Sequence, residues 1–196
     1  MFVSICIPTY NGSAYLSETL DSALSQSFKD FEVLVVDDNS TDNTLEIANR
    51  YAAIDTRVRV LQNSHNLGLV GNWNRCIELA KGEWIKFLFQ DDLLAPECLE
   101  KMIDYYEKSP VKEKVLFCKK DHIFENISSL RELNLKMNKI KFFWDLYPKK
   151  FHITPQDTIN LMLKWPSRNI FREPPSFLIH RDIFDKLGLF DNNFYH

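Results

Sequence analysis

Two pairs of adjacent aspartates, Asp37-Asp38 and Asp91-Asp92, are the residues whose types and spacing could do chemistry. Each pair directly follows an apolar run that is typical of a strand. Adjacent carboxylates repel, and two unit charges about 4 Å apart cost roughly 4 kcal/mol at an effective dielectric constant near 20. We therefore expect the pairs to bind a divalent cation or a ligand edge that is rich in hydrogen-bond donors.

Asp91 and Asp92 are candidate ligands for a divalent metal ion. Hard oxygen ligands suit Mg²⁺ or Mn²⁺, and Mg²⁺ is commonly held by one or two carboxylates together with substrate phosphates. A diphosphate beside bare carboxylates would be repelled, whereas a bridging dication reverses the sign of that interaction and stabilises a departing diphosphate. The alternative interpretation is a solvated turn in which one aspartate caps the following helix.

Asp38 suits a different role, as a hydrogen-bond acceptor for a nucleobase. An ionised carboxylate only accepts hydrogen bonds. Uracil and thymine present an imide N–H, and a charged acceptor at that position makes a strong, base-selective contact. The alternative is an Asx turn or a helix cap, a role for which Asp42 competes.

The composition is typical of a globular cytoplasmic protein. The chain has 196 residues, enough for one sizeable core, and its net charge of −3 argues against a nucleic-acid surface. It opens without a basic leader, and no apolar run approaches the roughly 18 residues of a membrane span. The four cysteines lack a CxxC spacing, so we expect free thiols in a reducing cytosol.

Apolar periodicity predicts strands that alternate with amphipathic helices. The expected strands are residues 2–8, 31–36, 57–62, 83–89 and 114–118. Four helices are expected. The first follows Ser13 as its N-cap, and the second spans residues 43–53 after Asp42. The third carries Trp73, Cys76, Ile77 and Ala80 on one face, and the fourth begins at Pro96. This order predicts an α/β fold with a mostly parallel sheet, right-handed crossovers and flanking helices.

The two aspartate pairs and residues 8–10 all fall at the carboxyl ends of expected strands. In open α/β sheets, ligands bind in the crevice beyond those ends. Three segments that are far apart in the sequence therefore converge on one edge of the sheet, and we expect the binding site there.

The last third of the chain has a weaker pattern. Residues 136–151 are basic and aromatic, and two interpretations stay open: peripheral contact with an anionic membrane surface or acceptor, or an irregular connection that buries its rings on the sheet. Thr154 is expected to cap a short helix, residues 176–180 to form a strand, and residues 182–187 to form a helical turn. Because there are no repeats and no linker, residues 1–196 are expected to form a single domain.

Several motifs, taken in order, resemble the family 2 glycosyltransferases. They are Ile5–Gly12 (ICIPTYNG), Val35–Asp42 (VVDDNSTD), Asn66–Gly68 (NLG), Phe87–Asp92 (FLFQDD) with Pro96 downstream, and the late segment from Pro175 to Asp191. The resemblance covers nearly the whole chain. It implies a GT-A fold, a nucleotide-diphosphate sugar donor, a divalent metal, Mn²⁺ or Mg²⁺, and inversion at the anomeric carbon.

The resemblance also implies roles for single residues. Nucleotide binding would fall to Pro8, Thr9, Tyr10, Asp38, Asn66, Gly68, Asn72 and Asp91, and metal binding to Asp91 and Asp92. Asp38 would accept the imide N–H of the base, so the donor would be a UDP- or dTDP-sugar. Residues 1–119 would form the nucleotide-sugar part and residues 120–196 the acceptor-side part.

The sequence departs from the family pattern at two places. The first acid of the family's D-x-D-D motif is Phe89 here, which puts one ribose or metal contact in doubt. The family's general base lies in a motif downstream of residues 188–191, so we expect the base beyond His196 and the acceptor-side part to be incomplete. Asp191 matches the motif before the base and is not assigned a catalytic role.

The function that follows from the resemblance is inverting, metal-dependent transfer of a sugar to the hydroxyl of a glycan or lipid-linked acceptor, in bacterial polysaccharide assembly. One alternative is a shortened, non-catalytic nucleotide-sugar binding protein that lacks the base. A second is a sugar-nucleotide nucleotidyltransferase, although the Gly-rich triphosphate loop of those enzymes is missing after the first strand. A receiver-type signalling domain also places acids at strand ends, but the long tail fits it poorly.

Overall fold

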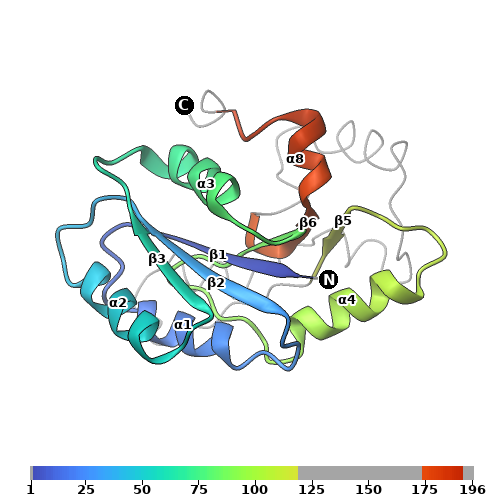
Figure 1. Cartoon of the computed structure of the whole chain (residues 1–196), viewed down its shortest axis with the longest axis horizontal. Coiled ribbons are helices and arrows are strands. Elements are labelled where there is room, and N and C mark those ends of the chain that lie inside the picture. The colour runs from blue at the N-terminus through green and yellow to red at the C-terminus, as the bar shows by residue number, and fades with distance from the viewer. Residues whose placement is uncertain (1, 119–173, 192–196) are drawn as a thin grey trace, which may run out of the picture. The chain divides into compact units, whose positions relative to one another are not determined.

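Figure 1 shows the computed structural model, which describes residues 2–118 and 174–191; they belong to one compact unit formed by residues 1–118 and 174–196. Their strands are β1 (Val3–Thr9), β2 (Phe31–Asp37), β3 (Val58–Gln62), β4 (Trp84–Phe87), β5 (Val115–Phe117) and β6 (Phe177–His180). Their helices are α1 (Leu16–Leu24), α2 (Thr44–Ile54), α3 (Gly68–Leu79), α4 (Cys98–Lys108), the 3-10 helix η1 (Pro174–Ser176) and α8 (Arg181–Leu187). The alternation of strands and helices agrees with the prediction.

The described strands form one sheet in the order β3-β2-β1-β4-β6-β5. Strands β3, β2, β1 and β4 run parallel to one another. The register pairs Thr9 of β1 with Asp37 of β2, and Cys6 of β1 with Phe87 of β4. Their carboxyl ends therefore meet at one edge, as the sequence predicted. β2 is buried along its whole length, which is typical of a parallel strand with helices on both faces.

Alternating side chains divide the core between the two faces of the sheet. One cluster joins residues such as Ile5 and Val33 to α1, α2 and α4, and the other joins Cys6 and Leu34 to α3 and α8. Figure 1 shows the same layering, with α3 and α8 on the opposite side of the sheet from α1, α2 and α4. Each face is well filled, so we expect a truncation such as Leu20→Ala to cost about 2–5 kcal/mol.

A strand from the last part of the chain enters the sheet between two earlier strands. β6 runs antiparallel to both β4 and β5. Lys86 of β4 is fully buried, and its ammonium donates hydrogen bonds to the carbonyls of Phe87 (3.4 Å) and Pro175. The sequence predicted both strands but not this insertion, because no local pattern records which distant strand a segment pairs with.

Several element boundaries differ from the prediction, those of α1, α4 and β4 by two residues. α1 begins at Leu16, and Ser13 is not its cap. α4 begins at Cys98 rather than at Pro96. β4 ends at Phe87, before the end that its apolar run suggested, because the residues that follow turn out of the sheet.

Asp42 joins the loop after β1 to the start of α2. Its Oδ1 accepts hydrogen bonds from the Thr44 N–H (3.0 Å) and hydroxyl (2.5 Å), and its Oδ2 accepts one from the Ser13 N–H (3.1 Å). Desolvation raises the pKa of Asp42, but the hydrogen bonds from Thr44 and Ser13 outweigh it and lower that pKa to about 2. The N-cap residue of α2 is Asn43 rather than Asp42, which instead binds the first helical residue, Thr44.

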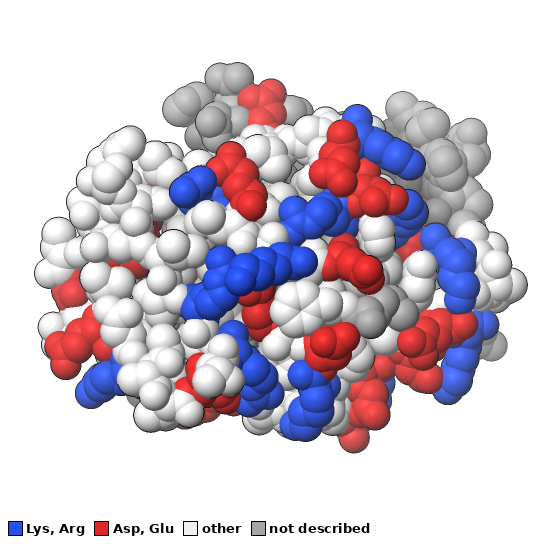
Figure 2. Space-filling view, in the orientation of Figure 1, with Lys and Arg blue, Asp and Glu red and all other residues white. Residues whose placement is uncertain are grey.

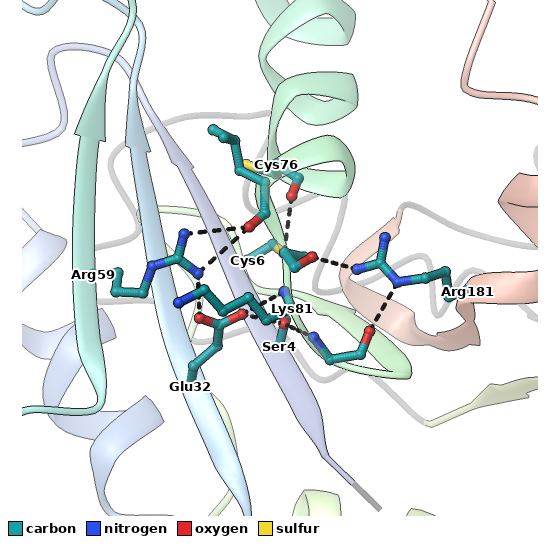
Figure 3. Close-up of polar contacts among 10 residues, drawn as sticks. Ser4, Cys6, Glu32, Arg59, Cys76, Lys81 and Arg181 are labelled. Atoms are coloured by element: carbon teal, nitrogen blue, oxygen red, sulfur yellow. Dashed lines mark hydrogen bonds and ion pairs between the residues drawn. The ribbon is translucent and has the colours of Figure 1, made fainter.

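Two arginines hold the carboxyl end of α3 (Figure 3). Arg59 of β3 donates to the carbonyl of Leu79 (3.4 Å), and Arg181 of α8 donates to the carbonyls of Ala80 (2.5 Å) and Gly82 (3.1 Å). Cations are favourable at this end of a helix, where the last carbonyls lack partners within the helix. α3 is therefore anchored there both by a neighbouring strand and by the late part of the chain.

The buried carboxylate of Glu32 lies beside this anchor (Figure 3). It accepts hydrogen bonds from the Ser4 hydroxyl (2.6 Å), the Lys81 N–H (2.7 Å) and the Arg59 guanidinium (2.5 Å). Burial raises the pKa of Glu32, but the hydrogen bonds from Ser4, Lys81 and Arg59 outweigh burial and lower that pKa below its ordinary value. The side chain therefore ties β1, β2, β3 and the end of α3 together.

Acidic and basic side chains of the described residues are interspersed on the face of the molecule drawn in Figure 2. Over the described ranges, no helix combines the length and the apolar character needed to cross a membrane. The basic, aromatic stretch 136–151 and the helix expected after Thr154 lie outside the described residues.

Candidate functional site

A pocket of about 370 Å³ opens at the carboxyl ends of β1, β2 and β4. All eight residues that the resemblance assigned to the nucleotide line it, together with four more. The lining residues are Pro8, Thr9, Tyr10, Asp38, Asn66, Gly68, Leu69, Asn72, Trp73, Phe89, Gln90 and Asp91. The structure thus brings four distant segments to one cavity, which is where parallel α/β sheets bind ligands.

The two carboxylates of the first pair differ in their surroundings, because Asp37 is the last residue of β2 and Asp38 is the first residue after it. Asp37 is fully buried and turns away from the pocket. It accepts four hydrogen bonds: from the Ser40 hydroxyl (2.5 Å) and N–H (3.0 Å), from Thr9 Oγ1 (3.4 Å) and from Gln62 Nε2 (3.2 Å). Asp37 therefore fixes the turn after β2 and has no acceptor site left for a ligand.

Asp38 faces the pocket and holds the loop that leads into α3. Its Oδ1 accepts hydrogen bonds from Asn63 Nδ2 (2.8 Å) and the Leu67 N–H (2.8 Å), and its Oδ2 accepts one from the Gly68 N–H (3.0 Å). A carboxylate offers about four acceptor sites, so one site on Oδ2 remains. The same contacts place a negative charge at the amino end of α3, where the helix dipole favours it.

Asn72 is buried and ties the two central strands to the third loop. Its Nδ2 donates to the carbonyls of Val36 (3.0 Å) and Thr9 (3.4 Å), and its Oδ1 accepts from Asn63 Nδ2 (3.0 Å). The Thr9 carbonyl also accepts the Asp38 N–H (2.8 Å), so Asn72 adds a second donor at that strand end. Asn72 therefore shapes the pocket wall from α3.

The first turn of α3 depends on a glycine. Gly68 has a φ of +76°, a left-handed conformation that a side chain would strain. Its N–H lies between Asp38 Oδ2 and Asn66 Oδ1 (2.9 Å), and Asn66 itself is exposed at the rim. Leu69 follows on the lining and is exposed too.

The second aspartate pair lies in the turn after β4 and is far less constrained. Asp91 is exposed, lines the pocket, and makes no hydrogen bond or ion pair within the described ranges. Asp92 follows it but does not line the pocket, and its N–H donates to the carbonyl of Phe89 (3.0 Å). Of the predicted metal pair, the structure therefore brings Asp91 to the cavity and leaves Asp92 beside it.

Gln90 clamps the loop after β1 to the end of β4. Its Oε1 accepts from the Tyr10 N–H (2.8 Å), and its Nε2 donates to the Tyr10 carbonyl (3.1 Å). The Gln90 carbonyl in turn accepts from the Thr19 hydroxyl (2.9 Å). Gly12 leaves room for the clamp, because a Cβ there would lie 2.2 Å from Gln90 Oε1.

An aromatic wall, formed by Trp73, Phe89 and Phe190, closes one side of the pocket. Trp73 and Phe89 line the cavity, and their rings stack with centroids 5.2 Å apart and an interplanar angle of 17°. Phe190 packs edge-on against Trp73, with centroids 5.7 Å apart. Phe89, which stands where the family pattern has an acid, therefore contributes a stacked ring in place of a carboxylate.

The charges on the lining favour a cation. Among the described residues that line the pocket, Asp38 and Asp91 carry a charge and none is basic. A diphosphate entering this cavity would meet two negative groups, and a bound dication would reverse the repulsion. No group of three or more His, Cys, Asp or Glu side chains that could hold a metal occurs in the part of the chain that the structure describes. Asp91 and Asp92 nevertheless fit a metal that takes its other ligands from substrate phosphates.

Sequence reasoning missed four residues of this site: Asn63, Leu69, Trp73 and Gln90. Phe89 was named only as the place of a missing acid, and Trp73 only as part of an apolar helix face. Gln90 carried a signal, since it lies between a strand end and two candidate ligands. Its partner Tyr10 is 80 residues away, and no local pattern reveals such a pairing.

Comparison with known proteins gives a consistent result. The model of the family described as glycosyl transferase family 2 matches residues 4–188. Chondroitin synthase of Pasteurella multocida is 40% identical over 116 residues, which are 59% of this chain and 12% of that protein. The chain spans well under half the length of the curated relatives with which it shares 40–41% identity.

Solved structures share the architecture. S. aureus TarS 1-349, in complex with UDP-GlcNAc, superposes with a TM-score of 0.69 at 26% identity, covering 94% of this chain and 48% of that one. The mannosyltransferase PcManGT of Pyrobaculum calidifontis, in complex with GDP-Man and Mn²⁺, gives a TM-score of 0.64 at 20% identity, covering 97% and 48%. The mixed α/β sheet with flanking helices is therefore the GT-A fold that the sequence predicted.

Proposed function

This chain belongs to glycosyl transferase family 2, and we propose that it binds a nucleoside diphosphate sugar in the pocket and transfers the sugar, with inversion, to an acceptor hydroxyl. One observation carries the proposal: all eight residues expected to bind the nucleotide line a single cavity whose only charged lining residues, among those described, are carboxylates. TarS, a relative by fold and sequence, has been solved with UDP-GlcNAc, which supports a donor of the same class.

Asp38 favours uracil or thymine as the base. Its one remaining acceptor site, on Oδ2, is aligned beside the Gly68 N–H. An imide N–H would complete the four acceptor sites of this carboxylate, whereas the N3 edge of cytosine presents an acceptor and would be repelled. We therefore propose a UDP- or dTDP-sugar as donor.

Asp91, with Asp92 beside it, would hold Mn²⁺ or Mg²⁺. The ion would neutralise the diphosphate as it leaves the anomeric carbon. Gln90 lies in the same turn. Its two hydrogen bonds to the Tyr10 backbone fix the position of the turn after β4. The Mn²⁺ complex of PcManGT shows that a protein of this fold can use such an ion.

The acceptor hydroxyl must lose a proton as it attacks from the face opposite the nucleotide, and a carboxylate is the usual base. We assign this role to no described residue, and a base beyond His196 stays a prediction. A glycan or lipid-linked acceptor in bacterial polysaccharide assembly is our proposal for the whole protein, supported by the likeness to a chondroitin synthase. The cytoplasmic location also stays a prediction.

The nucleotidyltransferase alternative is disfavoured by the loop after β1. A triphosphate needs free backbone N–H groups to cradle it. Here the N–H groups of residues 10–13 each donate to a side chain of the protein, in order Gln90, Ser40, Thr44 and Asp42. This loop is therefore built to hold the pocket together rather than to bind phosphates.

Calorimetric titration of UDP, dTDP and GDP, first with Mn²⁺ and then with EDTA, tests the proposal. We expect UDP or dTDP to bind with metal, to lose affinity with EDTA, and to lose it in Asp91→Asn. Failure of all three nucleotides to bind with metal present would refute the donor site. Metal-dependent binding without release of UDP from UDP-sugars, in the presence of candidate acceptors, would instead favour the non-catalytic binding protein.

A further inference from the structure

Asn74 of α3 forms a reciprocal pair of hydrogen bonds with the backbone of Phe190. Its Nδ2 donates to the Phe190 carbonyl (2.9 Å), and its Oδ1 accepts from the Phe190 N–H (2.9 Å). The side-chain amide thus imitates the edge of a strand, across 116 residues of sequence. It satisfies both backbone groups of one residue in the segment that follows α8.

The ring of the residue that Asn74 holds belongs to the aromatic wall of the pocket. Phe190 packs edge-on against Trp73 at 5.7 Å, and it also contacts Phe87 at 6.1 Å and Phe184 at 5.8 Å. Trp73 stacks in turn on Phe89, and these two rings line the cavity. Contacts therefore run without a gap from the Asn74 amide to the pocket.

The segment that carries Phe190 needs this support. Gly188 ends α8 with a φ of +86°, and Leu189 is exposed, so the chain leaves the helix toward solvent. Backbone groups there would otherwise exchange freely with water. The hydrogen bonds from Asn74 therefore decide whether the Phe190 ring stays against Trp73.

A purely structural role for Asn74 in holding α3 is the competing explanation, and the fold argues against it. The amino end of α3 is already held by Asp38 through the N–H groups of Leu67 and Gly68. Its carboxyl end is held by Arg59 and Arg181 (Figure 3). Asn74 is not needed to fix the helix, so its loss should act on residues 188–191.

We propose that Asn74 is a positioning residue: by fixing the backbone of Phe190 it keeps the Trp73–Phe89 stack in the shape that receives the nucleotide sugar. The inference deepens the proposed function and rests on it for the identity of the ligand. It also gives the late segment a part in the donor site, although that segment lies outside the motifs assigned to the nucleotide.

Hydrogen–deuterium exchange on the metal-free protein tests the first step. In Asn74→Ala the Phe190 N–H loses its acceptor, so we expect its exchange to accelerate about tenfold. The Leu67 and Gly68 N–H groups, bonded to Asp38, should exchange as before. Arg75→Ala is the matched control, because Arg75 is the next residue of α3 and pairs with Glu78 on the surface.

Nucleotide binding tests the second step, with UDP and Mn²⁺ as the probe. We expect Asn74→Ala to raise the Kd for UDP about fivefold to tenfold, and Arg75→Ala to leave it unchanged. Asn74→Asp keeps the acceptor for the Phe190 N–H but loses the donor to the Phe190 carbonyl. Its Kd for UDP should lie between those of Asn74→Ala and Arg75→Ala. This variant also keeps the test open if the alanine variant does not fold.

A double-mutant cycle separates positioning from a general loss of stability. If Asn74 acts through the Phe190 ring, Asn74→Ala should no longer change the Kd for UDP once Phe190→Leu is present. Additive effects of the two substitutions, or unchanged exchange at the Phe190 N–H in Asn74→Ala, would overturn the proposal. If the native chain bound none of UDP, dTDP and GDP with Mn²⁺, the proposed function would fail, and the exchange result alone would decide whether Asn74 positions the wall.

Discussion

The two aspartate pairs share a dipeptide sequence and a place at a strand end, yet they differ in how many hydrogen bonds they accept. Asp37 accepts four and Asp38 three. Asp91 accepts none within the described residues. Because a carboxylate offers about four acceptor sites, the protein nearly saturates Asp37 and Asp38, whereas no donor among the described residues occupies those of Asp91.

The difference explains how the chain tolerates adjacent carboxylates. In the first pair, separate sets of donors stabilise the charges of Asp37 and Asp38. In the second pair, the turn after β4 leaves Asp91 exposed to water, which screens its charge. The first pair therefore shapes the site, and Asp91 of the second pair is available to bind a ligand.

Substitution of Asp37 should have the largest effect of all, a loss of stability. Asp37→Ala removes a fully buried carboxylate and leaves the Ser40 N–H and hydroxyl without their acceptor, so we expect the free energy of unfolding to fall by about 3 kcal/mol. Urea denaturation followed by circular dichroism measures it. Asp91→Ala is the matched control and should change that free energy by no more than about 0.5 kcal/mol. Equal losses in the two variants would abolish the contrast between the pairs.

Removing the charge of Asp91 should appear in binding instead. We expect Asp91→Asn to raise the Kd for UDP with Mn²⁺ about a hundredfold, which corresponds to about 2.8 kcal/mol, while thermal unfolding stays unchanged. Addition of EDTA to the native protein should weaken UDP binding to a similar extent. Native affinity in Asp91→Asn would show that the exposed carboxylate is a surface residue.

Asp38 should combine both behaviours, because it holds the third loop and keeps one acceptor site free. Asp38→Asn turns an amide N–H₂ toward the donors of that loop, so we expect a loss of about 1 kcal/mol in stability and a tenfold weaker UDP affinity. Titration of UDP and GDP sharpens the result. A loss confined to UDP supports the contact with the base imide, whereas equal losses for both would reduce Asp38 to a loop residue.

Local patterns predicted the parts of the site that depend on one segment. Apolar runs located β1, β2 and β4, so the positions of Thr9, Asp38 and Asp91 at one edge followed from strand parallelism. Pairings between distant segments were not predictable, because periodicity carries no record of them. The insertion of β6 beside β4, the clamp of Gln90 on Tyr10 and the bond from Asn74 to the late chain are of this kind.

Glu32 is a third carboxylate that accepts several hydrogen bonds from the protein. Of the substitutions considered, its replacement should have the smallest effect. It is buried at the far end of α3 from the pocket, and hydrogen bonds from Ser4, Lys81 and Arg59 lower its pKa despite its burial. A carboxyl whose folded pKa is depressed adds stability above its unfolded pKa, near 4.3, and loses that contribution as the pH falls through the folded pKa.

We expect urea denaturation at pH 7 and at pH values below 4.3 to show a smaller pH dependence of the free energy of unfolding in Glu32→Gln than in the native protein. Glu97→Gln, at an exposed pair with Lys101, is the control. If Glu32→Gln kept the full native pH dependence, hydrogen bonds to the buried Glu32 carboxylate would not be what stabilises its charge. Hydrogen bonding would then also fail to explain how the charge of Asp37 is stabilised.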